Sequence, residues 1–166
     1  MFPKSNILIM GVSGSGKTTI ARQVSQKLNF QFLEADGFHP KENIEKMSQG
    51  KPLNDLDREP WLIAISEALT ELEGKGFVLA CSALKESYRE LLQKGLEKPL
   101  FIFYLEGSFE QILERMSKRK DHFMPETLLK SQFDTLEIPQ DAVRINIENS
   151  PEVITEIIIE KIKEIK

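Results

Sequence analysis

The stretch Gly11-Val12-Ser13-Gly14-Ser15-Gly16-Lys17-Thr18 decides the fold, because it fits the pattern G-x-x-x-x-G-K-[ST] of a phosphate-binding loop. Its glycines permit a tight turn whose backbone N–H groups converge on phosphate oxygens, and a helix beginning at the lysine adds its positive end. In this pattern the lysine contacts the β- and γ-phosphates and the threonine holds Mg2+. The alternative is a glycine-rich turn with a chance Lys-Thr pair, but an apolar run before the stretch and an amphipathic run after it favour the nucleotide loop.

Short apolar runs alternate with longer amphipathic stretches along the chain, as expected for a parallel sheet flanked by helices. Helices are predicted over residues 17–28 and 61–72, where apolar residues recur on one face. The predicted class is therefore α/β, with a five-stranded parallel sheet and helices on both of its faces. The five predicted strands cover residues 7–10, 30–33, 77–81, 100–105 and 143–147.

A last helix is predicted to follow Ser150, which is a good N-cap, with Pro151 at the first helical position. Its valine and isoleucine residues recur at helical spacing from Val153 to Ile165. We interpret this stripe as facing the core rather than a partner.

Length and composition indicate one domain over residues 1–166, since 166 residues and 19.0 kDa lie within the usual size of a single domain. The net charge of -4 gives no overall attraction to nucleic acid or to an anionic membrane, so neither is an expected partner. Cys81 is the single cysteine, which excludes an internal disulfide and favours a reducing cytoplasm. The apolar run 7–10 is too short for a signal peptide or a membrane span.

A phosphate-binding loop identifies a nucleotide but not a reaction. The GTPase strings N-K-x-D and D-x-x-G are absent from the sequence, and the chain is too short for a motor or transporter ATPase. A small kinase remains, and its second substrate is expected beyond the carboxyl ends of the strands, where open parallel sheets bind their ligands.

Two segments that follow predicted strands carry candidate substrate groups. Asp36 follows the second strand, where a carboxylate can accept a hydroxyl proton or orient the attacking oxygen. The Asp-Gly and His-Pro pairs beside it would equally suit a simple turn. After the third strand a helix is expected near Leu84, with Lys85 and Arg89 one turn apart, either as a solvated face or as a site for an anion.

A basic run between the fourth and fifth strands includes Arg115, Lys118, Arg119 and Lys120. A charged helix end would explain it. In a kinase, the same segment can form a mobile lid, here about residues 118–129, whose arginines stabilise charge on the transferring phosphoryl group. Further upstream, Asp57 is expected to cap the helix that contains Trp61, and the tryptophan by itself is more typical of a core.

Three strings together resemble the small bacterial-type gluconokinases, in order from the phosphate-binding loop to about Pro139. The strings are His39-Pro40-x-x-Asn43-x-x-Lys46-Met47-x-x-Gly50-x-Pro52-Leu53-x-Asp55-x-Asp57-Arg58-x-Pro60-Trp61, Cys81-Ser82-Ala83-Leu84-Lys85-x-x-Tyr88-Arg89, and His122-Phe123-Met124 with Ser131-Gln132-Phe133-x-Thr135-Leu136-Glu137. The family usually has glycine where this chain has Ala35 and Asp121, which affects the expected loop conformations there.

The resemblance implies a cytoplasmic, Mg2+-requiring homodimer that phosphorylates the 6-hydroxyl of D-gluconate with ATP. On this reading Lys17, Asp36 and Arg119 act in transfer, the loop and Arg115 hold the nucleotide, and Thr18 holds the metal. Arg58, Lys85 and Arg89 are candidates for the carboxylate of the substrate. The residues expected around the polyol are His39, Trp61, His122 and Gln132.

Two other functions remain open at this point. A kinase of another small acid, such as a shikimate kinase, would share the fold and the need for arginines. A non-catalytic sensor that binds ATP would share the loop, although Asp36 and the lid arginines argue against it.

Overall fold

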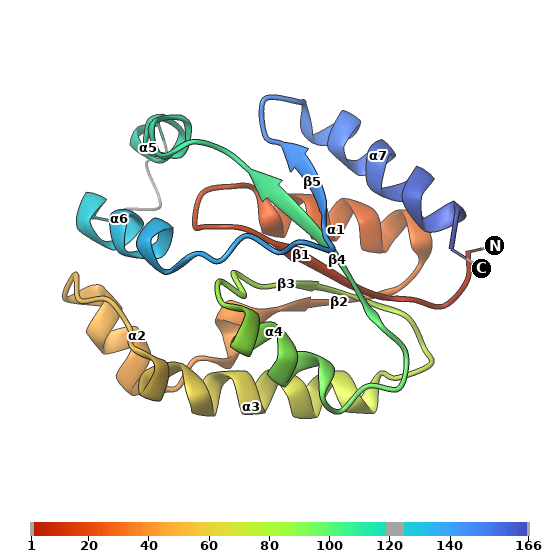
Figure 1. Cartoon of the computed structure of the whole chain (residues 1–166), viewed down its shortest axis with the longest axis horizontal. Coiled ribbons are helices and arrows are strands. Elements are labelled where there is room, and N and C mark those ends of the chain that lie inside the picture. The colour runs from red at the N-terminus through yellow and green to blue at the C-terminus, as the bar shows by residue number, and fades with distance from the viewer. Residues whose placement is uncertain (1, 119–124, 166) are drawn as a thin grey trace.

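Five parallel strands form one sheet in the order β2-β3-β1-β4-β5, so that β1 and its phosphate-binding loop lie at the centre (Figure 1). The computed structural model describes residues 2–118 and 125–165. The five predicted strands are confirmed, and their ends differ from the expected ones by one residue. Their bounds are β1 Asn6–Met10, β2 Gln31–Glu34, β3 Phe77–Ala80, β4 Leu100–Glu106 and β5 Val143–Asn146.

The central strands β1 and β3 are apolar apart from Asn6, because both of their faces are covered. Every residue of β1 and β3 is buried, and the two strands pair in parallel from Asn6 opposite Phe77 to Ile9 opposite Ala80. Parallel sheets covered on both faces have this composition. This packing holds the start of the glycine loop rigidly at the carboxyl end of β1.

Helices cover both faces of the sheet, as predicted (Figure 1). Helices α1 (Lys17–Leu28) and α7 (Pro151–Lys163) pack together on one face, and α3 (Asp55–Glu71) and α4 (Glu86–Gln93) pack together on the other. The Ser150 hydroxyl accepts a hydrogen bond from the Val153 N–H at 3.3 Å, which confirms the predicted N-cap. The predicted core stripe of α7 is confirmed for Ile154, Ile158 and Ile162, which are buried, but not for Val153, which is exposed.

The helix that contains Trp61 starts earlier than predicted, at Asp55 rather than at residue 61. Asn54 is its N-cap, so the prediction that Asp57 caps this helix is wrong. The Asn54 side chain accepts from the Asp57 N–H at 2.8 Å, and the Asp57 carboxylate accepts from the Asn54 N–H at 2.9 Å. This reciprocal capping box starts the helix upstream of Pro60, which the helix then contains.

The helix after β3 starts later than predicted, at Glu86 rather than near Leu84. Ala83 has a φ of 42°, a left-handed conformation that an α-helix does not accommodate. Lys85 therefore lies at the N-cap of α4 rather than within it.

The remaining helices lie at the end of the molecule toward which the strands point (Figure 1). They are α2 (Lys41–Ser48), α5 (Phe109–Ser117) and α6 (Glu126–Thr135), with a 3-10 turn η1 (Ala35–Phe38) directly after β2. Within residues 2–118 and 125–165, no helix is long and apolar enough to cross a membrane. The carboxyl ends of the strands are thus surrounded by short helical segments, of which η1 carries Asp36, α5 carries Arg115 and α6 carries Gln132.

Candidate active site

The glycine loop spans the gap between β1 and α1, and its shape depends on Gly14. This residue has a φ of +83°, which L side chains rarely adopt, and an added Cβ would lie 2.9 Å from Cγ of Met116 on α5. Gly16 precedes α1 with a φ of 99°. The loop therefore has glycine where the backbone turns and where α5 packs directly against it.

Lys17 and Thr18 lie at the start of α1, where both can face a phosphate. The Lys17 ammonium donates a hydrogen bond to the Val12 carbonyl at 2.9 Å, which holds the side chain back across the loop. The Thr18 hydroxyl donates to Oε2 of Glu34, the last residue of β2. The phosphate-binding role of Lys17 and the metal-binding role of Thr18 stay predictions.

Glu34 is a candidate site residue that the sequence analysis missed. Its position at the end of β2 could have suggested a site residue. Its contact with Thr18, however, depends on how β2 lies beside the loop, which the sequence does not show. No group of three or more His, Cys, Asp or Glu side chains in the described part of the chain could hold a metal ion. Mg2+ usually binds one or two protein oxygens together with phosphate oxygens and water. A hydroxyl next to one carboxylate fits that requirement.

A cleft of about 380 Å³ opens beside the loop and collects most of the predicted site residues. It extends from the phosphate side, at Lys17 and Thr18, to the 3-10 turn after β2 and the first turns of α3. The predicted residues that line it are Ser13, Gly14, Gly16, Lys17, Thr18, Asp36, His39, Arg58, Trp61 and Gln132. Phosphate-binding groups, an exposed carboxylate and an arginine therefore share one cavity.

Asp36 lies in the 3-10 turn η1 rather than at a strand end, and its side chain is exposed to the cleft. Its backbone N–H donates to Oε1 of Glu34 at 3.4 Å, and its carbonyl accepts from the His39 N–H at 3.4 Å. The turn thus holds the Asp36 carboxylate beside the nucleotide loop, where it could accept a proton from a bound hydroxyl.

Trp61 is at once a core residue and part of the cleft wall. Only 2% of its surface is exposed, and its indole N–H donates to the Ala35 carbonyl at 2.8 Å. The His39 ring stacks on the indole with 4.3 Å between centroids and 9° between planes. Burial lowers the pKa of His39 below its ordinary value of 6.5, with Asp36 opposing and Arg58 adding to that shift.

Arg58 points toward the cleft although the residue is buried. Its guanidinium donates to the Tyr88 hydroxyl at 3.1 Å, and that hydroxyl in turn donates to Oδ1 of Asp55. Lys85 forms an ion pair with Asp55 at 3.0 Å. Hydrogen bonds from Tyr88 and Lys85 lower the pKa of Asp55. Tyr88 is a second residue that the sequence analysis left without a role.

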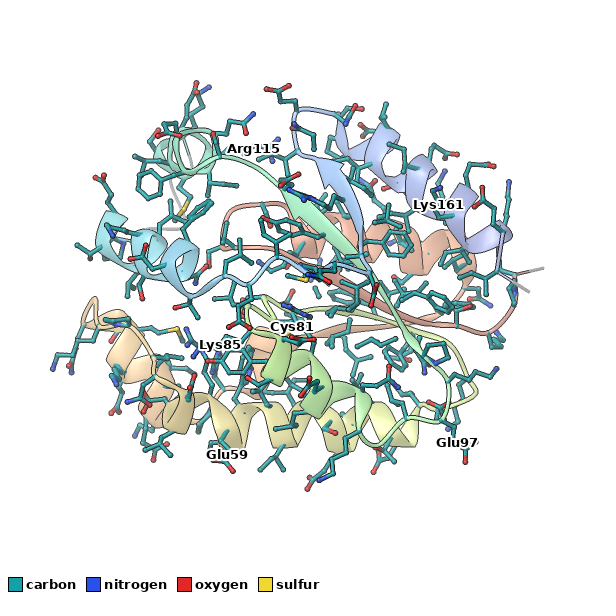
Figure 2. The ribbon with its side chains drawn as sticks, in the orientation of Figure 1. Glu59, Cys81, Lys85, Glu97, Arg115 and Lys161 are labelled. Carbon is teal, nitrogen blue, oxygen red and sulfur yellow. The ribbon has the colours of Figure 1, made fainter. Side chains whose placement is uncertain are left out.

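Three predicted residues outside the glycine loop, Lys85, Arg89 and Arg115, do not line the cleft. Arg89 is buried and donates to the carbonyls of Ala83, Leu84 and Glu137, so its donors tie α4 to two neighbouring loops. Arg115 donates to the Ile147 carbonyl. Figure 2 shows Arg115 on α5 and Lys85 at the start of α4, well separated from each other.

The other predicted residues are either inside the loop or outside the described part of the chain. Gly11, Val12 and Ser15 are buried within the loop itself. Arg119 and His122, with half of the expected lid (residues 119–124), lie outside the described residues.

Gln132 on α6 is bound to the nucleotide loop. The Ser13 N–H donates to Oε1 of Gln132 at 2.8 Å, and Nε2 of Gln132 donates to the Ser13 hydroxyl at 3.1 Å. Two hydrogen bonds therefore connect the helix that follows the basic segment to the phosphate-binding loop. Gln132 was predicted to lie near the polyol, and its contact with Ser13 was not predicted.

Cys81 lies in the middle of the molecule, directly after β3 (Figure 2). It is 1% exposed, and burial raises the pKa of its thiol to about 12. Its neighbour Ser82 lines the cleft. The thiol itself is therefore an inert part of the core immediately behind the site.

The parallel sheet, the glycine loop and the cleft beside it define a P-loop kinase. The family model described as Shikimate kinase matches residues 13–165. Solved structures at low identity agree on the fold: the shikimate kinase of Aquifex aeolicus is 17% identical with a TM-score of 0.63, over 94% of each chain.

Much greater similarity is found to gluconokinases. The thermosensitive gluconokinase of Escherichia coli is 48% identical over 158 residues, covering 91% of this chain and 83% of that protein. The gluconokinase of Gluconobacter oxydans is 44% identical, covering 92% and 88%. The crystal structure of a gluconokinase from Sinorhizobium meliloti has a TM-score of 0.88 at 41% identity, covering 97% and 92%. The chain belongs to the shikimate kinase family and, within it, to the gluconokinases.

Proposed function

We propose that this protein transfers the γ-phosphoryl group of ATP to the 6-hydroxyl of D-gluconate, giving 6-phospho-D-gluconate. The observation that carries the proposal is the single cleft in which the phosphate-binding loop, the Asp36 carboxylate and the Arg58 guanidinium meet. The identity of 40–48% to proteins named gluconokinase or probable gluconokinase supports the choice of substrate.

In this proposal, each site residue has a role that follows from its position in the cleft. Loop N–H groups and Lys17 bind the phosphates, and Lys17 stabilises the negative charge that develops during transfer. Asp36 orients the attacking hydroxyl and accepts its proton. Arg58, whose side chain reaches the cleft from α3, binds the carboxylate of the sugar acid. His39 and Trp61 form the wall that faces the polyol.

The structure fits Mg2+ at Thr18, with Glu34 beside it. When bound, the cation would neutralise charge on the β- and γ-phosphates. The Thr18 hydroxyl can offer an oxygen to the cation, and Glu34 already accepts from that hydroxyl. Removing divalent cations with a chelator is expected to abolish transfer, and adding Mg2+ back is expected to restore it.

We also propose that the basic segment acts as a lid over the transferring group. Arg119, with Arg115, would stabilise the transferring group, and His122 would contact the polyol. If Arg119 acts mainly in the transition state, Arg119→Ala lowers kcat steeply and leaves ATP dissociation constants within a few fold. Arg119→Lys restores the rate only partly, because it keeps the charge but loses the planar fork. Parental turnover of Arg119→Ala would contradict the lid role.

We further propose that residues 1–166 act as one domain, in a cytoplasmic homodimer, with neither nucleic acid nor a membrane as a partner. Lys85 and Arg89 remain candidates for the substrate carboxylate from the sequence analysis, although neither lines the cleft. Sedimentation of the purified protein tests the dimer directly.

One experiment separates the candidate functions. The purified protein is incubated with labelled ATP, Mg2+ and one of several acceptors: gluconate, other sugar acids, or shikimate. We expect label to be transferred to gluconate much faster than to shikimate. Transfer to shikimate alone would indicate the kinase of another acid, and ATP binding without transfer to any acceptor would indicate a sensor.

A further inference from the structure

The side chain of Asn43 on α2 is buried, with 3% exposure, and touches the ring of His39. Its Nδ2 lies 3.1 Å from Nδ1 of His39 and 2.8 Å from the Asp57 carbonyl oxygen. A carbonyl can only accept a hydrogen bond, so the amino group of Asn43, and not its oxygen, must face Asp57. The same amino group then faces His39.

This geometry decides which nitrogen of His39 carries the proton. An amino group donates and does not accept, so Nδ1 of His39 must be the unprotonated, accepting nitrogen. The proton of a neutral ring is then on Nε2. A doubly protonated ring would bring the Nδ1 proton against the amino group of Asn43, so the contact also disfavours imidazolium.

The free end of the ring belongs to the cleft. His39 lines the cleft, and its Nε2 forms no hydrogen bond to any other residue that the structure describes. The stacked indole of Trp61 keeps the ring plane fixed. The charged groups that act on the ring are Asp36 from η1 and Arg58 from α3, while α2 contributes only the neutral Asn43.

We propose that Asn43 is a positioning residue that holds His39 in the neutral Nε2–H form, so that the ring donates a hydrogen bond to an acceptor oxygen of the substrate. A hydroxyl or carboxylate oxygen of a sugar acid is such an acceptor. The identity of this acceptor rests on the proposed function, whereas the protonation state of the ring does not.

The ring nitrogens can be observed directly by NMR on the full-length protein. The sequence has two histidines, and His122→Gln leaves His39 as the single one for assignment. At pH 7.5 without substrate, we expect Nδ1 of His39 to have the shift of an unprotonated nitrogen and Nε2 that of a protonated one. The midpoint of its titration is expected below 6.5. Protonated Nδ1, or a mixture of both tautomers, would overturn the proposal.

Variants of Asn43 test whether this residue determines the tautomer of His39. Asn43→Asp replaces the donor with an acceptor, so we expect the proton to move to Nδ1 and the titration midpoint to rise. Asn43→Ala removes the donor and is expected to give a mixture of tautomers. Unchanged ring shifts in two folded variants would overturn the role of Asn43. If neither variant folds, the parental ring shifts alone still decide the tautomer.

Steady-state kinetics test whether the His39 ring contacts the substrate. We expect Asn43→Ala to raise KM for gluconate about three- to tenfold, the effect of losing one well-oriented hydrogen bond, with KM for ATP unchanged. Lys46→Met is the matched control, because Lys46 donates to the Asp57 carboxylate at 2.6 Å and joins the same two helices without touching His39. A similar rise in KM for gluconate in both variants would show that the helix contact, and not the tautomer, matters.

The experiments distinguish a failure of the proposed function from a failure of the proposed role of Asn43. If no sugar acid is phosphorylated but the ring shifts are as expected, the assignment to gluconate fails and the tautomer stands. If gluconate is phosphorylated but Nδ1 is protonated, the proposed function stands and the role of Asn43 fails.

Discussion

In the proposed reaction, Asp36 would act on the hydroxyl and Lys17 on the phosphates, from opposite sides of the reacting group. Asp36 is exposed on a turn and Lys17 is held across the loop by the Val12 carbonyl. Neither side chain fills space in the core, so both can be replaced without a cavity. Their loss should therefore affect the rate far more than the stability.

Lys17→Ala is expected to lower kcat about 100- to 1,000-fold, the usual effect of removing one group that stabilises developing charge. The melting temperature should change little. Steady-state rates with ATP and gluconate, together with a thermal melt, measure both quantities. Near-normal turnover would contradict the role of Lys17.

Asp36→Asn is expected to lower kcat about 100- to 10,000-fold, because the amide cannot accept the proton of the hydroxyl. The ATP dissociation constant should stay within a few fold, since Asp36 lies on the substrate side of the cleft. Isothermal titration with ATP and initial-rate kinetics test the two expectations. A similar loss of ATP affinity and of rate would place Asp36 in nucleotide binding instead.

Contacts between helices and loops explain the roles of Gln132 and Arg89, which could not be predicted from the sequence. Gln132 joins α6 to the nucleotide loop, and Arg89 joins α4 to the loops on either side of it. Each residue has one backbone partner distant in the sequence, Ser13 for Gln132 and Glu137 for Arg89, and a residue pattern contains no information on such partners.

Gln132→Glu is expected to weaken ATP binding more than Gln132→Ala does. The carboxylate would place a negative charge beside Ser13, whose N–H belongs to the phosphate-binding loop. Gln132→Ala loses both hydrogen bonds to Ser13, whereas Gln132→Glu keeps an acceptor for the Ser13 N–H and loses only the Nε2 donor; each bond lost costs about 0.5–1.5 kcal/mol of stability. Titration with ATP tests the effect of the charge, because the carboxylate is present only in Gln132→Glu, whereas Gln132→Ala shows the effect of losing the hydrogen bonds alone. Equal ATP affinities would show that position 132 is remote from the phosphates.

Arg89→Ala is expected to destabilise the fold by about 1–3 kcal/mol, because buried carbonyls lose their donor. KM for gluconate should be unchanged in the folded fraction. Lys85→Ala is the control, since its ion pair with Asp55 is partly exposed and exposed ion pairs contribute little to stability. A selective rise in KM for gluconate in both variants would instead support the carboxylate role inferred from sequence.

At the scale of the whole molecule, local signals in the sequence predicted the strands, the loop and the last helix. The strands are short apolar runs and the loop has a fixed pattern, so neither depends on distant residues. The predicted start of α3 at residue 61 was wrong, because the capping box at Asn54 starts the helix at Asp55, before Pro60. Glu34, Asn43 and Tyr88 were missed as site residues, since their roles come from contacts across the sheet or between helices.

The burial of Cys81 makes this thiol a reporter of how often the molecule opens. Alkylating reagents attack the thiolate, and a buried thiol with a pKa near 12 offers almost none at pH 8. Labelling with iodoacetamide should therefore proceed only through openings of the sheet, far more slowly than for a free cysteine. Because Ser82 lines the cleft, ATP and gluconate together should slow it further. Labelling at the rate of an exposed cysteine would contradict this expectation, and Cys81→Ala gives the background. Mass spectrometry could then measure occupancy of the cleft without following catalysis at all.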